Sequence, residues 1–431
     1  MSHENISTRI VRRSHARSVQ TVEADVCVLG AGISGVAAAL TAAKLGCKVV
    51  LVDGAPAIGG QAIGSIIGTI IGLYSHGPNA YQLTHGVADE LIADLTAEGS
   101  LSRSHNSTVM FQYDEVRLAR WMERKVEAAG VQTILGAILT DVAFAERRVQ
   151  HLELATRYGA IRVRAHGYVD SSGDATITYG AGLPVREPDA PVYGSLNFLI
   201  EGYDASAVAD LDIEAVRARL QEKGARYGLV RHDGWLIPFP GKAFMLANIT
   251  HMRTPLAPTE GARMVFEGRR QADGIVDFLR NEFPRVFANA RVRTYGNPGI
   301  RQTRWIVSRK QLTLADIRSA ERPPDAVARC AWWVELHDTP ETVYWEKFPA
   351  GHVYYIPLSC MVPEGADNIV AAGRCVDADT EALSAIRVMG PCIAMGAAAA
   401  HALSLAGTAA VHAVDMEKLK VALRDNLERK D

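Results

Sequence analysis

The sequence predicts an α/β protein that begins with a parallel βαβ unit and carries an α+β domain inserted late in the chain. Three observations lead to this fold class. A short apolar run, residues 25–29, ends at the glycines Gly30, Gly32 and Gly35; an alanine-rich stretch with helical character follows; and a second apolar run, 48–53, ends on Asp53. This order of strand, glycine turn, helix and strand is typical of a nucleotide-binding sheet.

The glycine spacing is G-x-G-x-x-G, and the acidic residue lies about twenty residues further on, which together form the dinucleotide-binding fingerprint of a Rossmann-like domain. Gly30 permits the tight turn, Gly32 lets a pyrophosphate approach the backbone, and Gly35 lets helix 33–45 pack on the strand. The phosphates then meet the free N–H groups and positive dipole of the helix start. Asp53 would accept hydrogen bonds from ribose hydroxyls. A glycine-rich turn in an ordinary α/β sheet is the alternative.

Length and composition exclude several other classes. The 431 residues suit two or three domains or one large domain with an insertion, and a net charge of −2 does not favour nucleic acid as a partner. No apolar run reaches the ~18 residues of a membrane span, and we expect the glycine-spaced run 63–73 to be buried. The six cysteines contain no CxxC pair, which argues against a zinc or other metal site and favours a cytoplasmic location.

The first 23 residues are expected to form a basic N-terminal arm. The stretch "RIVRRSHARS" is rich in arginine, but residues 18–25 are too polar for the apolar region of a twin-arginine export signal.

The choice between FAD and NAD depends on the residues after the second strand. Gly59 and Gly60 place bare backbone where the pyrophosphate of FAD would run. A helix is predicted over 113–130, and three strand-like runs follow before the chain returns to the sheet at 169–170. This small β-meander between the helix and the returning strand is an FAD-domain arrangement.

Two further stretches carry a specific resemblance. "DSSGDATITYGAGLP" (170–184) resembles the second nucleotide signature of FAD-dependent oxidoreductases with a glutathione-reductase-like FAD domain, and "NIVAAGRCVDADTEALSAIRVMGPCIAMGAAAAHAL" (368–403) is similar to their closing motif. "NPGIRQTRWIVSRKQLTLADI" and "VELHD" resemble the middle segment of one broad family of FAD-dependent oxidoreductases, distantly related to fumarate reductase and succinate dehydrogenase flavoproteins. The likeness covers about residues 24 to 410.

The resemblance implies FAD as the cofactor, with Asp174 reaching toward its ribityl and phosphate region and Gly373 letting the chain pass the flavin. The helix that starts near residues 388–390 would place its N-terminus at the pyrimidine side of the ring. The residues expected to bind FAD are Gly30, Gly32, Ile33, Ser34, Gly35, Asp53, Gly59, Gly60, Gln61, Leu139, Ser172, Gly173, Asp174, Gly373, Arg374 and Met389.

The same reasoning divides the chain. The FAD-binding domain is discontinuous, with residues 24–190 and 365–410, and the insertion 191–364 forms a substrate domain that caps the flavin, with helices over 213–224 and 258–281. Residues 411–431 form a helical tail. A second dinucleotide fingerprint is absent from the sequence, so electrons are expected to enter from an organic substrate and leave to oxygen, a quinone or a carrier protein rather than come from NAD(P)H.

The insertion holds the candidates for substrate chemistry. Arg301 and Arg304, about one helical turn apart, could clamp a substrate anion, or else form internal salt bridges. His337 is the leading general base, with Asp338 able to orient it; a structural histidine is the alternative.

Three further residues are weaker candidates. His352 and Tyr354 are next in line as the base. Arg387 could lie at the flavin edge, or pair with Glu381 or Asp379.

The expected function is an FAD-dependent dehydrogenase or oxidase that passes hydride from a small polar, anionic substrate to flavin N5. An FAD-dependent reductase of an activated C=C bond, a net non-redox flavoenzyme, and a flavin-binding protein without turnover are the alternatives. The fumarate reductase relatives carry a His-Thr-Arg dicarboxylate site of which this sequence has no clean copy, so succinate or fumarate chemistry is not carried over. Whether the protein forms a homo-oligomer is left open.

Overall fold

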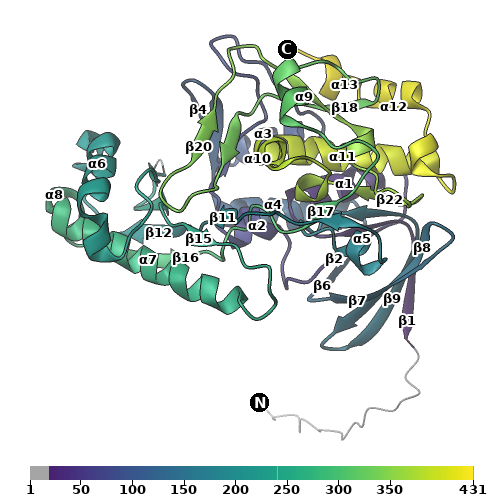
Figure 1. The fold of residues 1–431 in the computed structure, drawn as a ribbon, viewed down its shortest axis with the longest axis horizontal. Helices are drawn as coiled ribbons and strands as arrows, with labels where there is room; N and C mark the ends of the chain where they lie inside the picture. The colour runs from purple at the N-terminus through teal and green to yellow at the C-terminus, as the bar shows by residue number, and fades with distance from the viewer. Residues whose placement is uncertain (1–18, 240, 431) are drawn as a thin grey trace, which may run out of the picture.

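The computed structural model describes residues 19–239 and 241–430 and has an α/β architecture around one seven-stranded sheet (Figure 1). The strand order is β6-β2-β1-β9-β8-β7, with β22 also pairing with β9. Five of these strands run parallel: β1 (Gln20–Leu29), β2 (Val49–Asp53), β6 (Gln132–Leu135), β9 (Gly159–Asp170) and β22 (Ile369–Ala371). The predicted α/β class is therefore confirmed, and the sheet is completed by a strand from the last fifth of the chain.

The predicted β-meander forms the other edge of this sheet. Strands β7 (Ile138–Ala145) and β8 (Arg148–Thr156) are antiparallel to each other, and β8 is antiparallel to the first residues of β9. β9 is long enough to pair with β8 at its start and with β1 along most of its length, so one strand joins the meander to the parallel sheet.

Two helices far apart in sequence pack on each other at the sheet. They are α1 (Ile33–Lys44) and α11 (Met389–Ala406), both rich in small residues. A Cβ at Gly396 would lie 2.2 Å from the Ser34 carbonyl oxygen, so the two backbones approach as closely as glycine allows. Within the described residues α11 has the length and hydropathy of a membrane span, but 78% of it is buried inside the protein, as in a core helix.

The segment between β2 and β6 forms a small unit beside the sheet. β3 (Thr69–Ile70), β5 (Val109–Tyr113) and β4 (Leu101–His105) make a three-stranded sheet. The helices here are α2 (Gly60–Gly64), α3 (Val87–Ala97) and α4 (Glu115–Ala128), the last capped by the Asp114 carboxylate. Most of the glycine-spaced run 63–73 is buried, and the rest is partly buried.

The insertion has its own sheet and core. Strands β13 (Trp235–Pro238), β14 (Phe244–Asn248), β12 (Phe198–Glu201) and β16 (Arg291–Tyr295) form an antiparallel sheet, and the long helix α7 (Gly261–Glu282) lies along it (Figure 1). Further elements of the insertion are β11 (Tyr193–Gly194), α6 (Ile213–Lys223), β15 (Met252–Arg253), α8 (Pro284–Phe287) and β17 (Trp305–Ile306). Two short elements precede it, α5 (Thr176–Gly180) and β10 (Val185–Arg186), and β10 pairs with β17.

The last part of the insertion returns toward the first domain. Here β18 (Ala326–Cys330) pairs with β21 (Tyr354–Pro357), and β19 (Val334–Leu336) pairs with β20 (Tyr344–Glu346). The helices are α9 (Leu314–Ser319), α10 (Thr380–Ile386), α12 (Met416–Ala422) and α13 (Arg424–Glu428).

The C-terminal helix is fastened to β18 by one buried arginine. The Arg329 guanidinium, 2% exposed, donates hydrogen bonds to the carbonyl oxygens of Asn426 (2.8 Å), Asp425 (3.1 Å) and Arg429 (2.8 Å). A cation at the C-terminal end of a helix satisfies carbonyl groups that the helix itself leaves unpaired.

Some element boundaries differ from the sequence expectation. β1 begins at Gln20, not at residue 25, because residues 20–24 pair with 161–165 of β9 and so belong to the sheet. The expected N-terminal arm is shorter by those residues, and its first 18 residues lie outside the described part of the chain. α7 begins three residues late, at Gly261, because the chain makes a turn in which the Glu260 N–H bonds to the Ala257 carbonyl oxygen.

Candidate functional site

The glycine loop between β1 and α1 contains two glycines that the protein's own backbone requires. Gly30 has φ +101°, and a Cβ on it would lie 2.3 Å from the Ser171 carbonyl oxygen. A Cβ on Gly35 would lie 1.8 Å from the Gly30 carbonyl oxygen. Both positions exclude any larger residue for reasons of chain packing alone.

Gly32 differs from both. Its φ of −71° and ψ of −175° are open to any residue, and a Cβ there would find its nearest neighbour, the Gly60 Cα, at 4.0 Å. Packing therefore does not explain a glycine at the start of α1. Because Gly32 has no side chain, the space in front of the N-terminus of α1 is left open. Phosphate groups bind at such helix N-termini.

The second glycine pair closes one side of this space. The Gly59 N–H donates to the Ala31 carbonyl oxygen at 2.8 Å, and a Cβ on Gly60 would lie only 2.8 Å from the Gly32 Cα. The turn at Gly59 and Gly60 is therefore docked on the first glycine loop.

Two buried polar atoms without a hydrogen-bond partner belong to the same region. One is Ser34 Oγ in the first turn of α1, and the other is Nη1 of Arg374. Arg374 lies against Gly173, since a Cβ there would meet its Nη2 at 2.2 Å, and its Nη1 lies 3.9 Å from Asp174 Oδ1. Buried donors are almost always paired in native proteins. Ser34 Oγ and Arg374 Nη1 are therefore suited to donate hydrogen bonds to a bound anion.

Asp53, at the end of β2, is held by backbone groups. Its Oδ2 accepts from the Ala31 N–H at 2.6 Å and its Oδ1 from the Ala55 N–H at 2.7 Å, which leaves one lone pair on each oxygen for a ribose hydroxyl. The Ala137 N–H donates to the Asp53 carbonyl oxygen and holds this segment at the end of β2. Leu139, two residues further on, therefore lies near the same end of the sheet.

The second nucleotide motif is built around an acid that is fully buried. Asp170 accepts hydrogen bonds from Ser172 Oγ at 2.6 Å and from the Ile177 N–H at 2.8 Å, and burial raises the pKa of its carboxyl. The Gly173 N–H points at the Cys375 sulfur, 3.0 Å away. The role of Cys375 in fixing this turn could not be read from a single cysteine in the sequence.

One segment of the insertion crosses the two nucleotide motifs. Gln61 Nε2 donates to the Ile300 carbonyl oxygen at 3.0 Å, and Thr303 Oγ1 donates to Asp174. Residues 300–303 therefore run from the first motif to the second, and Arg301 lies between the two attachment points.

The start of α11 is more tightly occupied than expected. The Gly390 N–H donates to the Ile71 carbonyl oxygen at 3.0 Å, and a Cβ on Gly390 would lie 2.1 Å from the Gly72 carbonyl oxygen. This N–H is used by the fold itself and is not free for a ligand. Gly373, with φ +78°, lies against the Ser34 side chain, with 3.4 Å from its would-be Cβ to the Ser34 Cβ.

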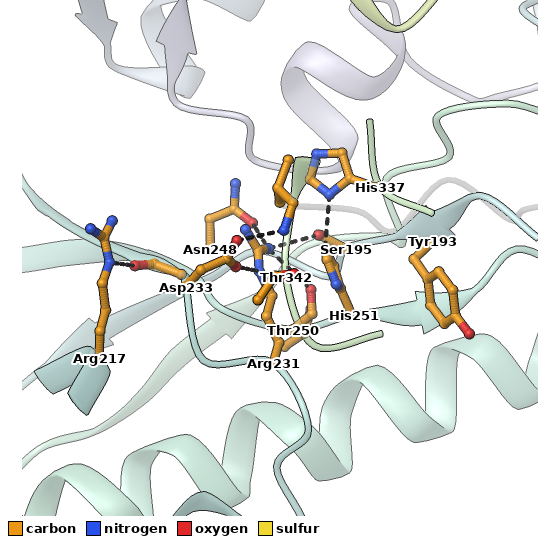
Figure 2. Close-up of polar contacts among 12 residues, drawn as sticks. Tyr193, Ser195, Arg217, Arg231, Asp233, Asn248, Thr250, His251, His337 and Thr342 are labelled. Atoms are coloured by element: carbon orange, nitrogen blue, oxygen red, sulfur yellow. Dashed lines mark hydrogen bonds and ion pairs between the residues drawn. The ribbon is translucent and has the colours of Figure 1, made fainter. Parts of the chain in front are cut away.

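The insertion gathers a second polar cluster around His337, which is 1% exposed (Figure 2). Its Nδ1 lies 2.8 Å from Nε2 of His251, and its Nε2 lies 3.2 Å from Oε1 of Glu335. His251 in turn has its Nδ1 3.1 Å from the Pro340 carbonyl oxygen. Both ring nitrogens of His337 are therefore occupied by neighbours from this chain.

Three guanidinium groups surround this cluster. Arg231 pairs with Asp233, with 2.7 Å between Nε and Oδ1 (Figure 2). Arg387 donates to the Glu335 carbonyl oxygen at 3.1 Å. In the described part of the chain, neither Arg301 nor Arg387 has a carboxylate oxygen within 4.0 Å.

The partners of Arg301 are neutral. It donates to the Tyr193 carbonyl oxygen at 2.7 Å and to Ser195 Oγ at 3.0 Å. Loss of solvent and the positive charges of Arg387 and Arg231 hold the pKa of Arg301 well below its ordinary value. Such a group is stabilised by any anion that approaches it.

The same charges act on the two histidines. Burial, followed by Arg301, Arg387 and Arg231, lowers the pKa of His337 well below the ordinary 6.5. Burial and Arg231 also lower the pKa of His251. Burial and these positive charges therefore disfavour the protonated form of both rings.

Several of the predicted partners are elsewhere. Asp338 is exposed, and Glu335 occupies the position expected for it. Arg304 is not paired with Arg301, because residues 301–304 are not helical; it stacks on Tyr179, with 4.0 Å from its Cζ to the ring centroid.

The two reserve bases have structural contacts. His352 Nε2 lies 2.9 Å from the Ile317 carbonyl oxygen, and its ring stacks on Phe348. Tyr354 is fully buried and donates to the Trp332 carbonyl oxygen at 2.8 Å. Arg387 does not form the pair with Glu381 or Asp379 that was its alternative; Asp379 caps α10 instead.

A cavity of about 540 Å³ adjoins the cluster on the side of the insertion. His251 and Gln302 line it, together with Tyr193 and Arg253. This volume is within the range that holds a small organic molecule.

Comparison with known proteins shows which family this sequence matches. The sequence profile of the family described as FAD dependent oxidoreductase matches residues 25–423. A geranylgeranyl bacteriochlorophyll reductase-like protein from Thermoplasma acidophilum has a similar fold, with 14% identity, a TM-score of 0.51, and coverage of 95% of this chain and 85% of its own. Two further solved structures are less similar. One is the flavin-dependent brominase Bmp2, with 14% identity, a TM-score of 0.47, and coverage of 94% of this chain and 83% of its own. The other is p-nitrophenol 4-monooxygenase PnpA from Pseudomonas putida DLL-E4, with 11% identity, a TM-score of 0.42, and coverage of 95% of this chain and 82% of its own. No curated protein matches the sequence.

Proposed function

Because the chain belongs to the family of FAD-dependent oxidoreductases, we propose that it oxidises a small organic anion held by Arg301 of the insertion and Arg387 at the end of α10. The cofactor is FAD, which when bound accepts two electrons from a substrate as a hydride. The protein supplies position and charge around it.

The residues of the first domain suit such a cofactor. The space at Gly32, the unpartnered Ser34 Oγ and the unpartnered Nη1 of Arg374 would hold the pyrophosphate, and Asp53 the adenosine ribose. Ser172, Gly173 and Asp174 would lie along the remainder of the molecule, at the point where residues 300–303 cross.

The observation that carries the proposal is an excess of positive charge. Arg301 and Arg387 face the cluster without a carboxylate partner, whereas Arg231 has Asp233. Placing unpaired guanidiniums out of water is costly unless an anion neutralises them. A substrate carboxylate bound by Arg301 and Arg387 supplies that charge, and Glu335 with His337 lies beside it to exchange a proton.

The proposal is tested with the purified protein under anaerobic conditions. A panel of small hydroxy and amino acids, and of matched uncharged alcohols and amines, is mixed with the FAD-loaded protein, and the flavin absorbance is followed. We expect bleaching by one or more anions and none by their uncharged analogues. Bleaching by uncharged compounds alone would contradict the anionic substrate, and reoxidation of dithionite-reduced protein by an unsaturated acid would indicate the reverse, reductive direction.

Arg301→Gln should weaken substrate binding without loss of FAD. Glutamine is shorter than arginine and carries a hydrogen-bonding amide without the positive charge, and a hydrogen bond to a charged group contributes about 1.5–3 kcal/mol. We expect KM for the anion to rise roughly 10- to 100-fold, with a smaller change in kcat. Arg304→Gln is the matched control from the same segment, because Arg304 contacts Tyr179 and Glu187 instead. Equal effects of the two substitutions would remove Arg301 from the anion site.

We also propose oxygen, a quinone or a carrier protein as the electron acceptor. The sheet of the insertion is antiparallel, unlike the parallel sheet that binds a nicotinamide dinucleotide. NADH and NADPH should therefore reduce the flavin slowly in an anaerobic stopped-flow measurement. Reduction by either within seconds at cellular concentrations would overturn this part of the proposal.

A further inference from the structure

The contacts of His251 and His337 determine where their protons lie. The Pro340 carbonyl oxygen can only accept a hydrogen bond, so Nδ1 of His251 carries a proton. Nε2 of a neutral His251 is then bare and can only accept, so Nδ1 of His337 must donate to it across 2.8 Å. A neutral His337 is left with a bare Nε2.

That bare nitrogen faces Glu335 Oε1 at 3.2 Å. A carboxylate is also only an acceptor, so a contact between the two lone pairs is not a hydrogen bond. One additional proton between Glu335 and His337 completes an unbroken series from Glu335 to Pro340. The geometry therefore provides a place for one proton that neither side chain holds when both are in their ordinary forms at neutral pH.

The charged groups around Glu335 and His337 oppose the uptake of this additional proton. The charged groups that face the pair are Arg301, Arg387 and Arg231, with Asp233 behind the last. These guanidiniums disfavour an added positive charge, and an anion bound to Arg301 and Arg387 offsets them. Proton uptake by the pair is thus expected to follow anion binding, and by linkage the anion binds more tightly when the pair is protonated.

His337 itself has no free nitrogen for a substrate. Its side chain is 1% exposed, and both nitrogens have partners within the chain. The Glu335 side chain is 18% exposed, and its Oε2 is oriented by a hydrogen bond from Trp332 Nε1 at 3.1 Å. Of the two groups, the carboxyl is the one that can reach a ligand.

We propose that Glu335 is the catalytic acid–base group of this site and that His337 and His251 are positioning residues that complete a hydrogen-bonded series when Glu335 takes up the substrate proton. This inference rests on the proposed function. The X–H bond of the substrate breaks, its proton forms an O–H bond at Glu335, and the electron pair left on X forms a C=X double bond. The hydrogen of the adjacent C–H bond leaves with its electron pair as the hydride that the cofactor would accept. The same pair, already protonated, would donate a proton if the enzyme ran in the reductive direction.

The first experiment needs no substrate. Histidine ring nitrogens are labelled with 15N in the FAD-loaded protein, and the His337 and His251 signals are assigned by their loss in His337→Asn and His251→Asn. We expect His251 to show a proton on Nδ1, and the Nε2 signal of His337 to change in a single step as pH rises, when the nitrogen loses the hydrogen bond that it accepts from the protonated Glu335 carboxyl. In Glu335→Gln the amide can donate to Nε2 and accept from Trp332, so the fold is kept and the step should be lost.

Asp233→Asn is the matched control. It removes one negative charge from the same arginine cluster, and within residues 19–239 and 241–430 the Asp233 carboxylate accepts from Arg231 and from the Val343 N–H at 2.6 Å, not from the histidine pair. This variant should keep the Nε2 step at a shifted pH. The same step in wild type and Glu335→Gln, or its loss in Asp233→Asn as well, would overturn the proposal.

The second experiment uses the anion found in the anaerobic panel. Glu335→Gln should slow substrate-driven flavin reduction by about 10²–10⁴-fold, the usual contribution of a general base. His337→Asn should move the acidic limb of the kcat/KM profile to lower pH, because the carboxylate then lacks the neighbour that helps it hold a proton. If kcat/KM of His337→Asn fell equally at every pH and the acidic limb of its profile stayed in place, the role of His337 would be structural only. If no anion reduces the flavin, the proposed function fails, whereas the NMR result still decides the placement of the proton.

Discussion

Gly32→Val should give a folded protein that no longer binds FAD. The backbone at Gly32 has dihedral angles that valine adopts freely, and a Cβ there has no neighbour closer than 4.0 Å. The branched side chain would instead occupy the space in front of α1 where the pyrophosphate is expected. The measurement is the ratio of FAD to protein after desalting, together with the circular dichroism and melting temperature of the apo-protein. We expect a ratio close to zero and a melting temperature near that of wild-type apo-protein.

Two other glycines serve as comparisons, Gly30 in the same loop and Gly46 in the turn after α1. Gly30→Val would place a Cβ 2.3 Å from the Ser171 carbonyl oxygen at φ +101°, so this variant should fail to fold. Gly46→Ala has a similar φ of +84° but open space around it, and should bind FAD normally. The melting comparison uses apo-protein throughout because a bound ligand raises the apparent stability of the native state. A Gly32→Val protein with full FAD content would show that the phosphates lie elsewhere.

Arg329→Met should destabilise the whole protein by about 3 kcal/mol or more. The guanidinium satisfies the carbonyl oxygens of Asn426, Asp425 and Arg429 in a buried position, and it lies 5.7 Å from the Tyr81 ring centroid. Methionine fills similar volume but removes this donor from all three oxygens, although the Asp425 oxygen keeps another, the Arg429 N–H at 3.3 Å. Each buried group left unpaired costs about 1–3 kcal/mol. Urea unfolding at saturating FAD, followed by tryptophan fluorescence, gives the change in the free energy of unfolding.

Arg322→Met is the control for this substitution. Arg322 contacts the same C-terminal helix through Glu428, with 3.4 Å between Nη2 and Oε1, but both side chains are exposed. Surface ion pairs of this kind contribute about 0–1 kcal/mol. A similar loss in both variants would mean that the C-terminal helix is held by its charges in general and not by the buried hydrogen bonds of Arg329.

The first domain could be predicted almost entirely from the sequence. Its helices and strands follow from apolar periodicity, and the loop at Gly30, Gly32 and Gly35 is local, so spacing alone identifies it. The errors are of position: β1 starts at Gln20 because its outer residues pair with β9, which no local pattern reveals.

The cluster in the insertion could be predicted only in part. Arg301 and His337 were found because they lie in segments that resemble a family, but Arg231 and His251 are brought to them by long-range packing. Glu335 lies beside His337 in the segment VELHD, where Asp338 was chosen instead. The assumption of helical spacing misplaced Arg304, since residues 301–304 are not helical. Burial, which lowers the pKa of His337, is likewise a property of the finished fold.

The pairing of β22 with β9 and of α1 with α11 has a consequence for how the protein is made. The glycine loop leaves the ribosome within the first tenth of the chain, but α11 and the turn that carries Arg374 leave it only in the last fifth. Contacts of such long sequence separation form late and slowly. During synthesis the face of α1 that packs on α11 therefore stays uncovered for about 350 residues, a state that favours aggregation and chaperone binding. FAD can be captured in its full site only after translation is nearly finished, so cofactor supply acts on the completed chain.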